Sequence, residues 1–109
     1  LTSLSDSDSE RIFRRNIRSQ VSSLLDLAEE AGIDGVVCSP QELELLSQRN
    51  SLLSVTPGIR LKNFNDDQKR VMTPREAIEL GANYIVIGRP ITSSENISKS
   101  LNEIYLSIQ

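Results

Sequence analysis

Residues 73–90, with the sequence TPREAIELGANYIVIGRP, contain a helix followed directly by a strand. Thr73 and Pro74 are typical first residues of a helix, because threonine caps the unpaired N–H groups and proline fits the first turn. Gly81 is expected to end this helix, and the apolar run YIVIG at 84–88 predicts a strand. A helix that leads straight into an apolar strand indicates an α/β fold.

Two further strands precede this unit. The short apolar runs GVVCS at 35–39 and LLSVT at 52–56 are typical of parallel strands buried on both faces. Between them, SPQELELLSQR at 39–49 predicts a helix with Ser39 as its cap. We also expect the end of a strand at 1–4.

Two more segments show helical spacing of apolar residues. One amphipathic helix is predicted to begin with Ser7 or Ser9 as its cap and to end at Gly32. A final helix is predicted over 97–108, where isoleucine and leucine recur every three or four residues. A strand and a helix therefore alternate four times, which predicts a parallel sheet with right-handed crossovers and helices outside it.

Four such units make either a small open sheet or the (βα)4 half of a TIM-type (βα)8 barrel. A whole barrel needs about 250 residues, so a chain of 109 residues supplies only half of one. The chain also begins at Leu1 without an initiator methionine, and we expect it to be part of a longer protein. In either architecture, ligands bind at the carboxyl ends of the strands.

Composition excludes several classes of function. The chain is 38% hydrophobic and 25% charged, which suits one domain over 1–109. Its formal net charge of -3 gives no basic surface for DNA or RNA, so we expect no nucleic acid polymer as a partner. The absence of histidine excludes Ser-His-Asp and Cys-His catalysis and histidine-based zinc sites. No apolar run approaches the length of about 18 residues that a membrane span needs, so no membrane partner is expected.

Cys38 is the single cysteine, so it forms no internal disulfide. Its place in the apolar run GVVCS favours a small buried side chain over a nucleophile. With no secretion signal in the sequence, this cysteine usage predicts a cytoplasmic protein. The arginines at 11, 14, 15 and 18 are expected to form a solvated or partner-facing surface.

Polar loops follow the third and fourth predicted strands. Gly58 and Arg60 come after the third strand, and Gly88 and Arg89 come after the fourth. Glycine lets a ligand approach the backbone closely, and arginine donates two parallel hydrogen bonds to phosphate oxygens. Taken singly, Gly58 is also explained by a turn and Arg89 by surface exposure. Because both loops leave neighbouring strands at one edge, together they predict a phosphate site.

The segments VTPGIR at 55–60 and NDDQKRVMTPREAIELGANYIVIGRPIT at 65–92 closely resemble the C-terminal half of bacterial-type orotidine 5'-phosphate decarboxylase. The resemblance extends over most of the chain, from Leu1 to its end. It is specific because related barrels that act on sugar phosphates lack the segment DDQKRVMTP. The resemblance implies that residues 1–109 correspond to strands 5–8 of the family's barrel.

The resemblance also implies roles for five residues. Arg60 and Arg89 would bind the phosphate of orotidine monophosphate, with the backbone of Gly88 assisting. Gln68, in a mobile loop, would close over the ligand between phosphate and pyrimidine, and Thr2 would meet the base. The family needs no cofactor and no metal, so none is expected here.

The family's chemical step depends on residues that this chain lacks. In the family, a lysine within an Asp-x-Lys-x-x-Asp arrangement protonates the carbanion at pyrimidine C6, and the aspartates hold charge against the departing carboxylate. This spacing does not occur in the 109 residues. The nearest sequence, DDQKR at 66–70, has different spacing and lies in the predicted lid loop, 58–72. A further aspartate comes from the second subunit of the family's homodimer, so we expect no catalytic residue in this chain and no activity from it alone.

Three functions stay open at this point. In the first, the chain is the phosphate-binding half of a decarboxylase that makes uridine monophosphate and CO2 in pyrimidine biosynthesis. In the second, it is an inactive remnant or a non-catalytic module for phosphate binding or assembly. In the third, it is an independent open α/β domain. Two unpaired sheet edges and an exposed apolar face predict that the chain pairs with an N-terminal half or with itself. An Asp-x-Lys-x-x-Asp strand in frame or in a neighbouring gene would favour the enzyme.

Overall fold

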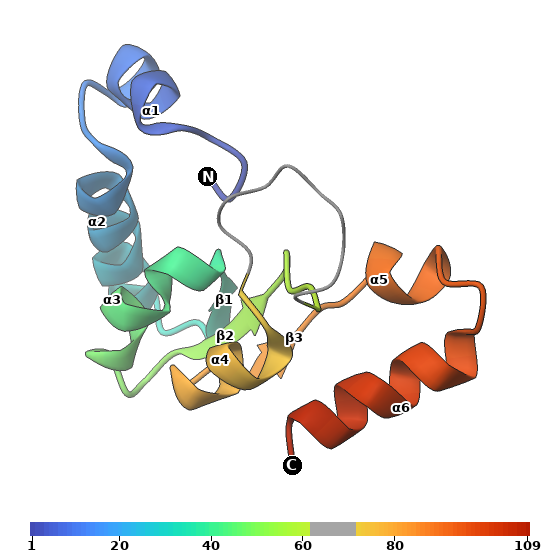
Figure 1. Ribbon diagram of the computed structural model, residues 1–109. Helices are drawn as coiled ribbons and strands as arrows, with labels where there is room; N and C mark the ends of the chain where they lie inside the picture. The colour runs from blue at the N-terminus through green and yellow to red at the C-terminus, as the bar shows by residue number, and fades with distance from the viewer. Residues whose placement is uncertain (62–71) are drawn as a thin grey trace.

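The computed structural model describes residues 1–61 and 72–109 and shows an α/β fold (Figure 1). In this part of the chain a parallel sheet has the strand order β1-β2-β3. Its strands are β1 (Gly35–Val37), β2 (Leu53–Thr56) and β3 (Tyr84–Ile85). Successive strands pair in parallel, so the chain crosses over between them, as the alternation of strands and helices predicts.

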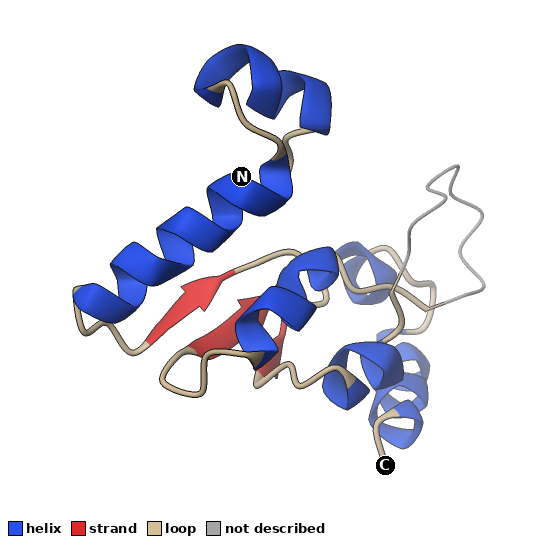
Figure 2. Cartoon of the chain, turned by 90° about the vertical axis from the view of Figure 1, so that its left-hand side faces the viewer, coloured by secondary structure: helices blue, strands red, loops and turns tan. Residues whose placement is uncertain are grey.

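Helices occupy the connections between strands and the two ends of the chain. They are α1 (Asp6–Phe13), α2 (Ile17–Glu30), the 3-10 helix η1 (Pro40–Glu42), α3 (Leu43–Ser47), α4 (Pro74–Glu79), α5 (Arg89–Thr92) and α6 (Ile97–Ser107). Helix α2 runs beside β1, and α1 lies beyond its N-terminal end (Figure 2). No helix within the described residues is both long enough and apolar enough to span a membrane.

The prediction of one long helix ending at Gly32 is wrong, because the chain breaks between α1 and α2. Arg14 adopts a left-handed conformation with φ 54° and ends α1. Asn16 then caps α2, and its side-chain oxygen accepts a hydrogen bond from the N–H of Ser19 at 2.9 Å. An asparagine that can cap a new helix competes with continuation of the old one.

The cap of α1 is Ser5 rather than Ser7 or Ser9. The hydroxyl of Ser5 accepts a hydrogen bond from the N–H of Asp8 at 3.2 Å, and the Asp8 carboxylate accepts one from the N–H of Ser5 at 3.1 Å. This reciprocal arrangement satisfies two N–H groups of the first turn. The side chain of Ser9 is instead fully buried.

Several other elements also differ from the predictions. The expected strand end at 1–4 is a turn, in which the N–H of Leu4 donates to the carbonyl of Leu1 at 3.1 Å, and no strand of the described chain pairs with it. The strand predicted at 84–88 is limited to β3, and the segment after it forms the short helix α5 rather than a loop. The helix predicted over 39–49 divides into η1 and α3.

The start of α4 is confirmed. The Thr73 hydroxyl accepts a hydrogen bond from the N–H of Glu76 at 3.3 Å, and the Glu76 carboxylate accepts one from the N–H of Thr73 at 2.8 Å. Pro74 occupies the first turn, and the helix is followed by Gly81 with φ 92°. The Ser39 cap also forms, since the Glu42 carboxylate accepts a hydrogen bond from the N–H of Ser39 at 2.9 Å.

The core lies between the helices and one face of the sheet. Its buried apolar members are Val21, Leu25, Ala28, Cys38, Leu43, Leu45, Leu46, Leu52, Ile59, Ala77 and Ala82. Ser54 and Thr56 of β2 are fully buried on the helix-covered face. The opposite face of the sheet carries Val37, Leu53, Tyr84 and Val86, which are all exposed. An exposed apolar face of this kind agrees with the expectation for half of a barrel.

Candidate functional site

The carboxyl ends of the three strands meet at one edge of the sheet. The N–H of Cys38 donates to the carbonyl of Val55 at 3.1 Å, and the N–H of Val86 donates to the carbonyl of Thr56 at 2.8 Å. These bonds continue the parallel ladders one residue beyond β1 and β3. The loops that carry the predicted phosphate residues therefore leave the sheet from neighbouring strands.

The loop after β2 fixes the backbone of Arg60. Gly58 has φ 78°, a left-handed conformation that glycine adopts without the penalty of a side chain. The next residue, Ile59, is buried in the core and pairs with Met72 in an isolated parallel bridge. The N–H of Arg60 donates to the carbonyl of Met72 at 3.1 Å. The buried Ile59 and the hydrogen bond to Met72 therefore fix the backbone of Arg60, from which its half-buried side chain extends.

The segment after β3 presents Gly88, the N-cap of α5, and Arg89, the first residue of that helix, to solvent. The carbonyl of Gly88 accepts hydrogen bonds from the N–H groups of Ile91 at 2.9 Å and Thr92 at 3.0 Å, which begins α5. A Cβ atom added to Gly88 would meet nothing within 4 Å. The backbone at Gly88 is therefore open to a ligand on that side, and the exposed Arg89 side chain follows it directly.

Thr2 lies at the other end of the same edge. It lines a cavity of about 200 Å³ together with Cys38 and Glu42, at the carboxyl end of β1. It also lines a second cavity of about 230 Å³ that includes Arg18. The fold thus sets the loops of Arg60 and of Gly88 and Arg89 on adjacent strands and places Thr2 beside β1. Gln68 and most of the predicted lid loop lie outside the described residues.

Cys38 is a buried side chain, as its apolar surroundings predict. Its Sγ lies 3.8 Å from the Oγ1 of Thr56, and burial raises the pKa of the thiol. A raised pKa keeps the thiol neutral and weakly nucleophilic at neutral pH. The contact with Thr56 was not expected, because nothing in the spacing of 18 residues between them indicates it.

Ile59 and Met72 are the residues of this site that the sequence did not single out. They join the two ends of the predicted lid loop, and Ile59 is almost completely buried. The sequence signal for the pairing of Ile59 with Met72 is only that one apolar residue stands at each end of a polar segment. Within residues 1–61 and 72–109, no group of three histidine, cysteine, aspartate or glutamate side chains is placed to hold a metal ion.

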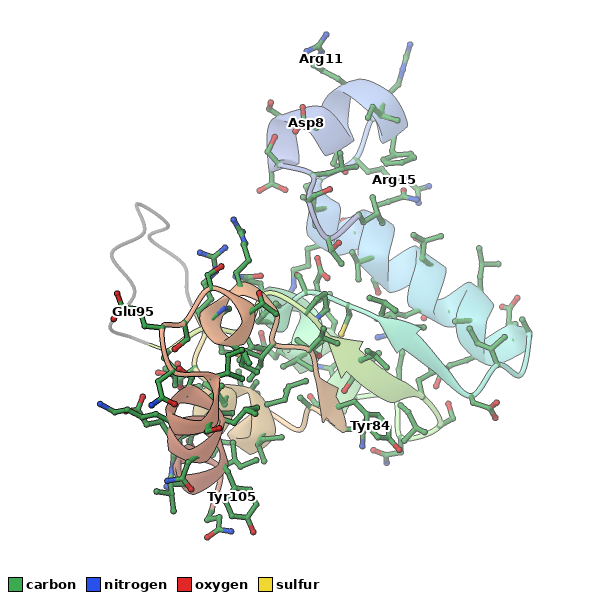
Figure 3. All side chains as sticks on the ribbon, turned by 90° about the vertical axis from the view of Figure 1, so that its right-hand side faces the viewer. Asp8, Arg11, Arg15, Tyr84, Glu95 and Tyr105 are labelled. Atoms are coloured by element: carbon green, nitrogen blue, oxygen red, sulfur yellow. The ribbon has the colours of Figure 1, made fainter. Side chains whose placement is uncertain are left out.

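The arginine-rich segment near the N-terminus is solvated, as predicted. Arg11 and Arg15 lie at the surface around α1 (Figure 3). Arg15 donates a hydrogen bond to the hydroxyl of Ser23 at 3.1 Å, and Arg18 forms an ion pair with Glu44 at 3.5 Å. Exposed pairs of this kind contribute little to stability, so they give no reason to place a ligand there.

Comparison with known proteins identifies relatives over nearly the whole chain. Residues 1–104 match the model of the orotidine 5'-phosphate decarboxylase / HUMPS family. The chain is 51% identical over 98 residues to the orotidine 5'-phosphate decarboxylase of Dictyoglomus thermophilum. This match covers 87% of this chain and 40% of that protein. It is also 50% identical, over an alignment of 112 residues, to the orotidine 5'-phosphate decarboxylase of Idiomarina loihiensis. That match covers 99% of this chain and 48% of that protein.

Solved structures give the same result. The orotidine 5'-phosphate decarboxylase of Lactobacillus acidophilus superposes with a TM-score of 0.78 at 37% identity, over 100% of this chain and 46% of that one. An uncharacterized conserved protein from Geobacillus kaustophilus superposes with a TM-score of 0.76 at 30% identity. The chain thus spans less than half the length of these relatives. The parallel α/β arrangement is that of one half of a TIM-type barrel.

Proposed function

Because the chain belongs to the orotidine 5'-phosphate decarboxylase / HUMPS family, we propose that it supplies the phosphate-binding part of an orotidine 5'-phosphate decarboxylase. The completed enzyme converts orotidine monophosphate to uridine monophosphate and CO2. In this proposal residues 1–109 form the C-terminal half of the barrel, with its strands corresponding to strands 5–8 of the family.

One observation carries the proposal. The loops of Arg60 and of Gly88 and Arg89 follow β2 and β3, which are joined at their carboxyl ends by the 2.8 Å hydrogen bond from Val86 to Thr56. A phosphate dianion held there would receive charge-assisted hydrogen bonds from two guanidinium groups and from open backbone. Phosphate sites of TIM-type barrels are commonly built from the loops after the last two strands.

The other assigned residues rest on the resemblance. Gln68 would close over the ligand from the loop after β2. Thr2, which precedes α1 and lies beside the carboxyl end of β1, would meet the pyrimidine base. Binding energy gained at the phosphate, away from the reacting carbon, would position the substrate and lower the barrier of the chemical step. The chain's role is therefore to bind and orient the nucleotide.

The partner in this proposal is the N-terminal half of the barrel. The chain spans 48% of the Idiomarina loihiensis enzyme, and the Asp-x-Lys-x-x-Asp spacing does not occur in it. The missing half would supply the lysine that protonates C6 and the aspartates beside it. The completed enzyme would act in the cytoplasm as a homodimer, without a cofactor.

Decarboxylation of orotidine monophosphate tests this function. Loss of pyrimidine absorbance is followed with this chain alone, with the N-terminal half of the Idiomarina loihiensis enzyme alone, and with both co-expressed. Activity only in the combination supports the proposal. Activity of this chain alone would contradict its assigned role, and a stable but inactive combination would contradict the enzyme assignment.

The phosphate assignment has its own test in the active combination. We expect Arg89→Ala to weaken binding of uridine monophosphate by about 2–3 kcal/mol, as for loss of hydrogen bonds to a charged group. Arg75→Ala is the matched control, because Arg75 is an exposed arginine on α4 that pairs with Glu79 at 2.9 Å. Gln68→Ala is expected to have a smaller effect than Arg89→Ala, since a closing loop contributes only in the closed state. Unchanged binding in Arg89→Ala would refute the assignment.

A non-catalytic phosphate-binding module is the second candidate. The absence of the Asp-x-Lys-x-x-Asp spacing from these 109 residues favours it. It predicts that this chain binds uridine monophosphate or inorganic phosphate by itself and that adding an N-terminal half produces no turnover. Isothermal titration of the chain alone separates the two candidates, because the enzyme proposal expects weak binding without the other half.

A further inference from the structure

We propose that Ile59 is a positioning residue for Arg60. Through its burial and its bridge with Met72, Ile59 holds the Arg60 guanidinium where the phosphate of a nucleoside monophosphate binds. The contact between Arg60 and a phosphate rests on the proposed function, whereas the dependence of Arg60 on Ile59 rests on the structure. Ile59 is only 1% exposed, so it acts through Arg60 and not by touching the ligand.

Arg60 lies outside the strands and helices of the described chain. β2 ends at Thr56, and α4 begins at Pro74. Neither a helix nor a strand of the sheet therefore defines the backbone of Arg60. A backbone that becomes ordered only when a ligand binds costs part of the binding free energy. A strong phosphate contact thus requires Arg60 to be held in place before the ligand arrives.

Arg89, the other arginine of the proposed phosphate site, is held by a different means. It is the first residue of α5, and its carbonyl accepts a hydrogen bond from the N–H of Ser93 at 3.0 Å. The residue after it, Pro90, is buried. Helix α5 therefore fixes the backbone of Arg89, so of the two arginines we expect only Arg60 to depend on Ile59.

Burial of the Ile59 side chain is the first restraint on Arg60. Ile59 belongs to the same buried apolar cluster as Ala77 of α4 and Leu43 of α3. Rotation about χ1 is restricted in isoleucine, because its Cβ carries two heavy atoms. A buried side chain with so few rotamers leaves little freedom to the backbone on either side of it, and Arg60 is the next residue.

The bridge with Met72 is the second restraint. Ile59 and Met72 form an isolated parallel bridge, and the N–H of Arg60 donates to the carbonyl of Met72 at 3.1 Å. Met72 packs against the core. It directly precedes Thr73, the cap of α4, whose N–H donates to the Glu76 carboxylate at 2.8 Å. The backbone amide of Arg60 is thus bound to the start of a capped helix.

Ile59 takes part in both restraints, and this distinguishes it from other core residues. Truncating it is expected to release the Arg60 amide in addition to leaving a cavity, whereas truncating a core residue elsewhere leaves only a cavity. Leu43 is the matched control, because it is also 1% exposed and its neighbours in the chain form α3. A positioning role therefore predicts different effects of Ile59→Ala and Leu43→Ala on Arg60.

Amide hydrogen exchange of the whole chain tests the restraint without a ligand. The reference amide is that of Val86, which donates to the carbonyl of Thr56 at 2.8 Å. Ile59→Ala is expected to accelerate exchange at Arg60 about 10-fold more than at Val86, because the opening is local. Leu43→Ala is expected to accelerate both amides alike. Equal acceleration of both amides in Ile59→Ala would overturn the proposal.

The unsubstituted chain gives a test that does not depend on the folding of a variant. The Arg60 amide is expected to exchange more slowly than an unstructured amide, because the Met72 carbonyl accepts it. Exchange at the unstructured rate would overturn the proposal even if Ile59→Ala did not fold. The conservative variant Ile59→Val is expected to keep most of this protection.

Binding of uridine monophosphate tests the consequence for the ligand. The chain is co-expressed with the N-terminal half of the Idiomarina loihiensis enzyme, and thermal unfolding identifies the variants that stay folded. Ile59→Ala is expected to weaken binding about 10-fold, as for the cost of ordering one backbone residue, and Ile59→Val much less. Leu43→Ala is expected to change binding by less than about 2-fold, as for an independent site. An equal loss in Leu43→Ala would assign the effect to general destabilisation and overturn the positioning role.

A double-mutant cycle shows whether Ile59 acts through Arg60. In an Arg60→Ala background, Ile59→Ala is expected to weaken binding no further, because the guanidinium that it positions is gone. A further loss of the same size would overturn the positioning role. If Arg60→Ala weakens binding and Ile59→Ala does not, the positioning role is refuted and the proposed function stands. Unchanged binding in Arg60→Ala would instead refute the phosphate role that the proposed function assigns to Arg60, whatever exchange shows at its amide.

Discussion

Two regions of the molecule differ in how completely they bury their apolar side chains. Helices α2 and α3 contribute Val21, Leu25, Leu43 and other buried residues to the core. Helix α6 buries Ile104, while Ile97, Leu101 and Tyr105 stay exposed. Tyr105 of α6 lies at the surface, as does Tyr84 of β3 (Figure 3).

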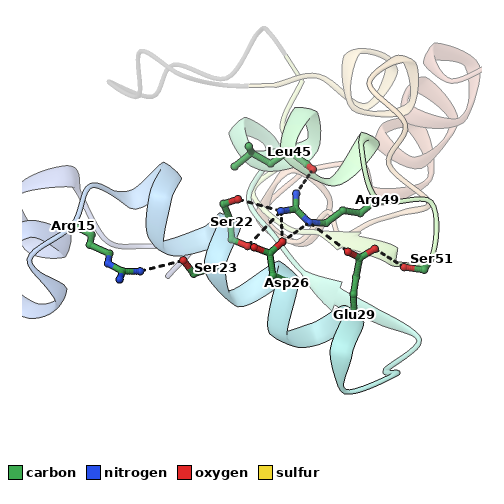
Figure 4. Close-up of polar contacts among 8 residues, drawn as sticks. All are labelled: Arg15, Ser22, Ser23, Asp26, Glu29, Leu45, Arg49 and Ser51. Atoms are coloured by element: carbon green, nitrogen blue, oxygen red, sulfur yellow. Dashed lines mark hydrogen bonds and ion pairs between the residues drawn. The ribbon is translucent and has the colours of Figure 1, made fainter.

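The first region is also joined by polar contacts between its helices (Figure 4). Arg49 follows α3, and its side chain is only 13% exposed. Its Nη2 lies 2.6 Å from the Asp26 carboxylate of α2, and its Nη1 donates to the carbonyl of Leu45 at 2.9 Å. Glu29 of α2 accepts a hydrogen bond from the hydroxyl of Ser51 at 2.6 Å. The α2–α3 region is thus packed by this chain's own residues, whereas α6 leaves most of its apolar side chains exposed.

The largest expected difference between the regions is in core truncation. Leu43→Ala in α3 is expected to lower the free energy of unfolding by about 2–5 kcal/mol, because the leucine is 1% exposed and leaves a cavity. Leu101→Ala in α6 is the matched control, with a leucine that is 48% exposed and an expected loss below about 1 kcal/mol. Urea unfolding measures both. Equal losses would show that α6 is packed as firmly as α3.

The next effect concerns Arg49. Arg49→Ala is expected to lower the free energy of unfolding by about 1–2 kcal/mol, because it removes hydrogen bonds from a mostly buried guanidinium while Asp26 is largely exposed. Arg75→Ala removes the exposed pair with Glu79 and is expected to change stability by less than about 0.5 kcal/mol. Thermal unfolding at low and at high salt compares the two. A larger loss in Arg75→Ala would contradict the role of Arg49 in joining α2 to α3.

Two asparagine caps offer a comparison at matched chemistry. The side-chain oxygen of Asn16 accepts the N–H of Ser19 at 2.9 Å in α2, and that of Asn96 accepts the N–H of Lys99 at 3.0 Å in α6. Asn16→Ala is expected to lower global stability by about 1 kcal/mol. Asn96→Ala is expected to accelerate amide exchange within α6 more than it lowers global stability, because a loosely packed helix opens locally. Equal global losses would argue against local opening of α6.

The smallest effect is the pH dependence due to Cys38. Burial raises the pKa of this thiol in the folded state, so above the pKa of an unfolded thiol the folded state holds more protons than the unfolded state. Stability must therefore fall as pH rises through this alkaline window. Cys38→Ala is expected to show a shallower fall, measured by urea unfolding between about pH 8 and pH 10, a range around the ordinary thiol pKa. An identical slope in the variant would mean that other groups cause it.

Local signals in the sequence predicted the fold class and the elements with strong caps. The start of α4 at Thr73 and Pro74 and the cap at Ser39 depend on residues next to one another in the sequence. The parallel order of the strands follows from the alternation of apolar runs. The break at Arg14 was missed because the apolar spacing continues across it, and only the cap formed by Asn16 marks the new helix. The sequence likewise did not distinguish Ser5 from Ser7 and Ser9 as the cap of α1, because all three serines can cap a helix and they lie within four residues of one another.

Local sequence patterns are enough to predict a parallel α/β unit with arginine and glycine after two successive strands. These features are encoded by residues close together along the chain. The pairing of Ile59 with Met72 and the contact between Cys38 and Thr56 arise only in the folded chain. Those contacts join residues far apart in sequence, and they depend on how the strands register and how the helices pack, which no local pattern specifies.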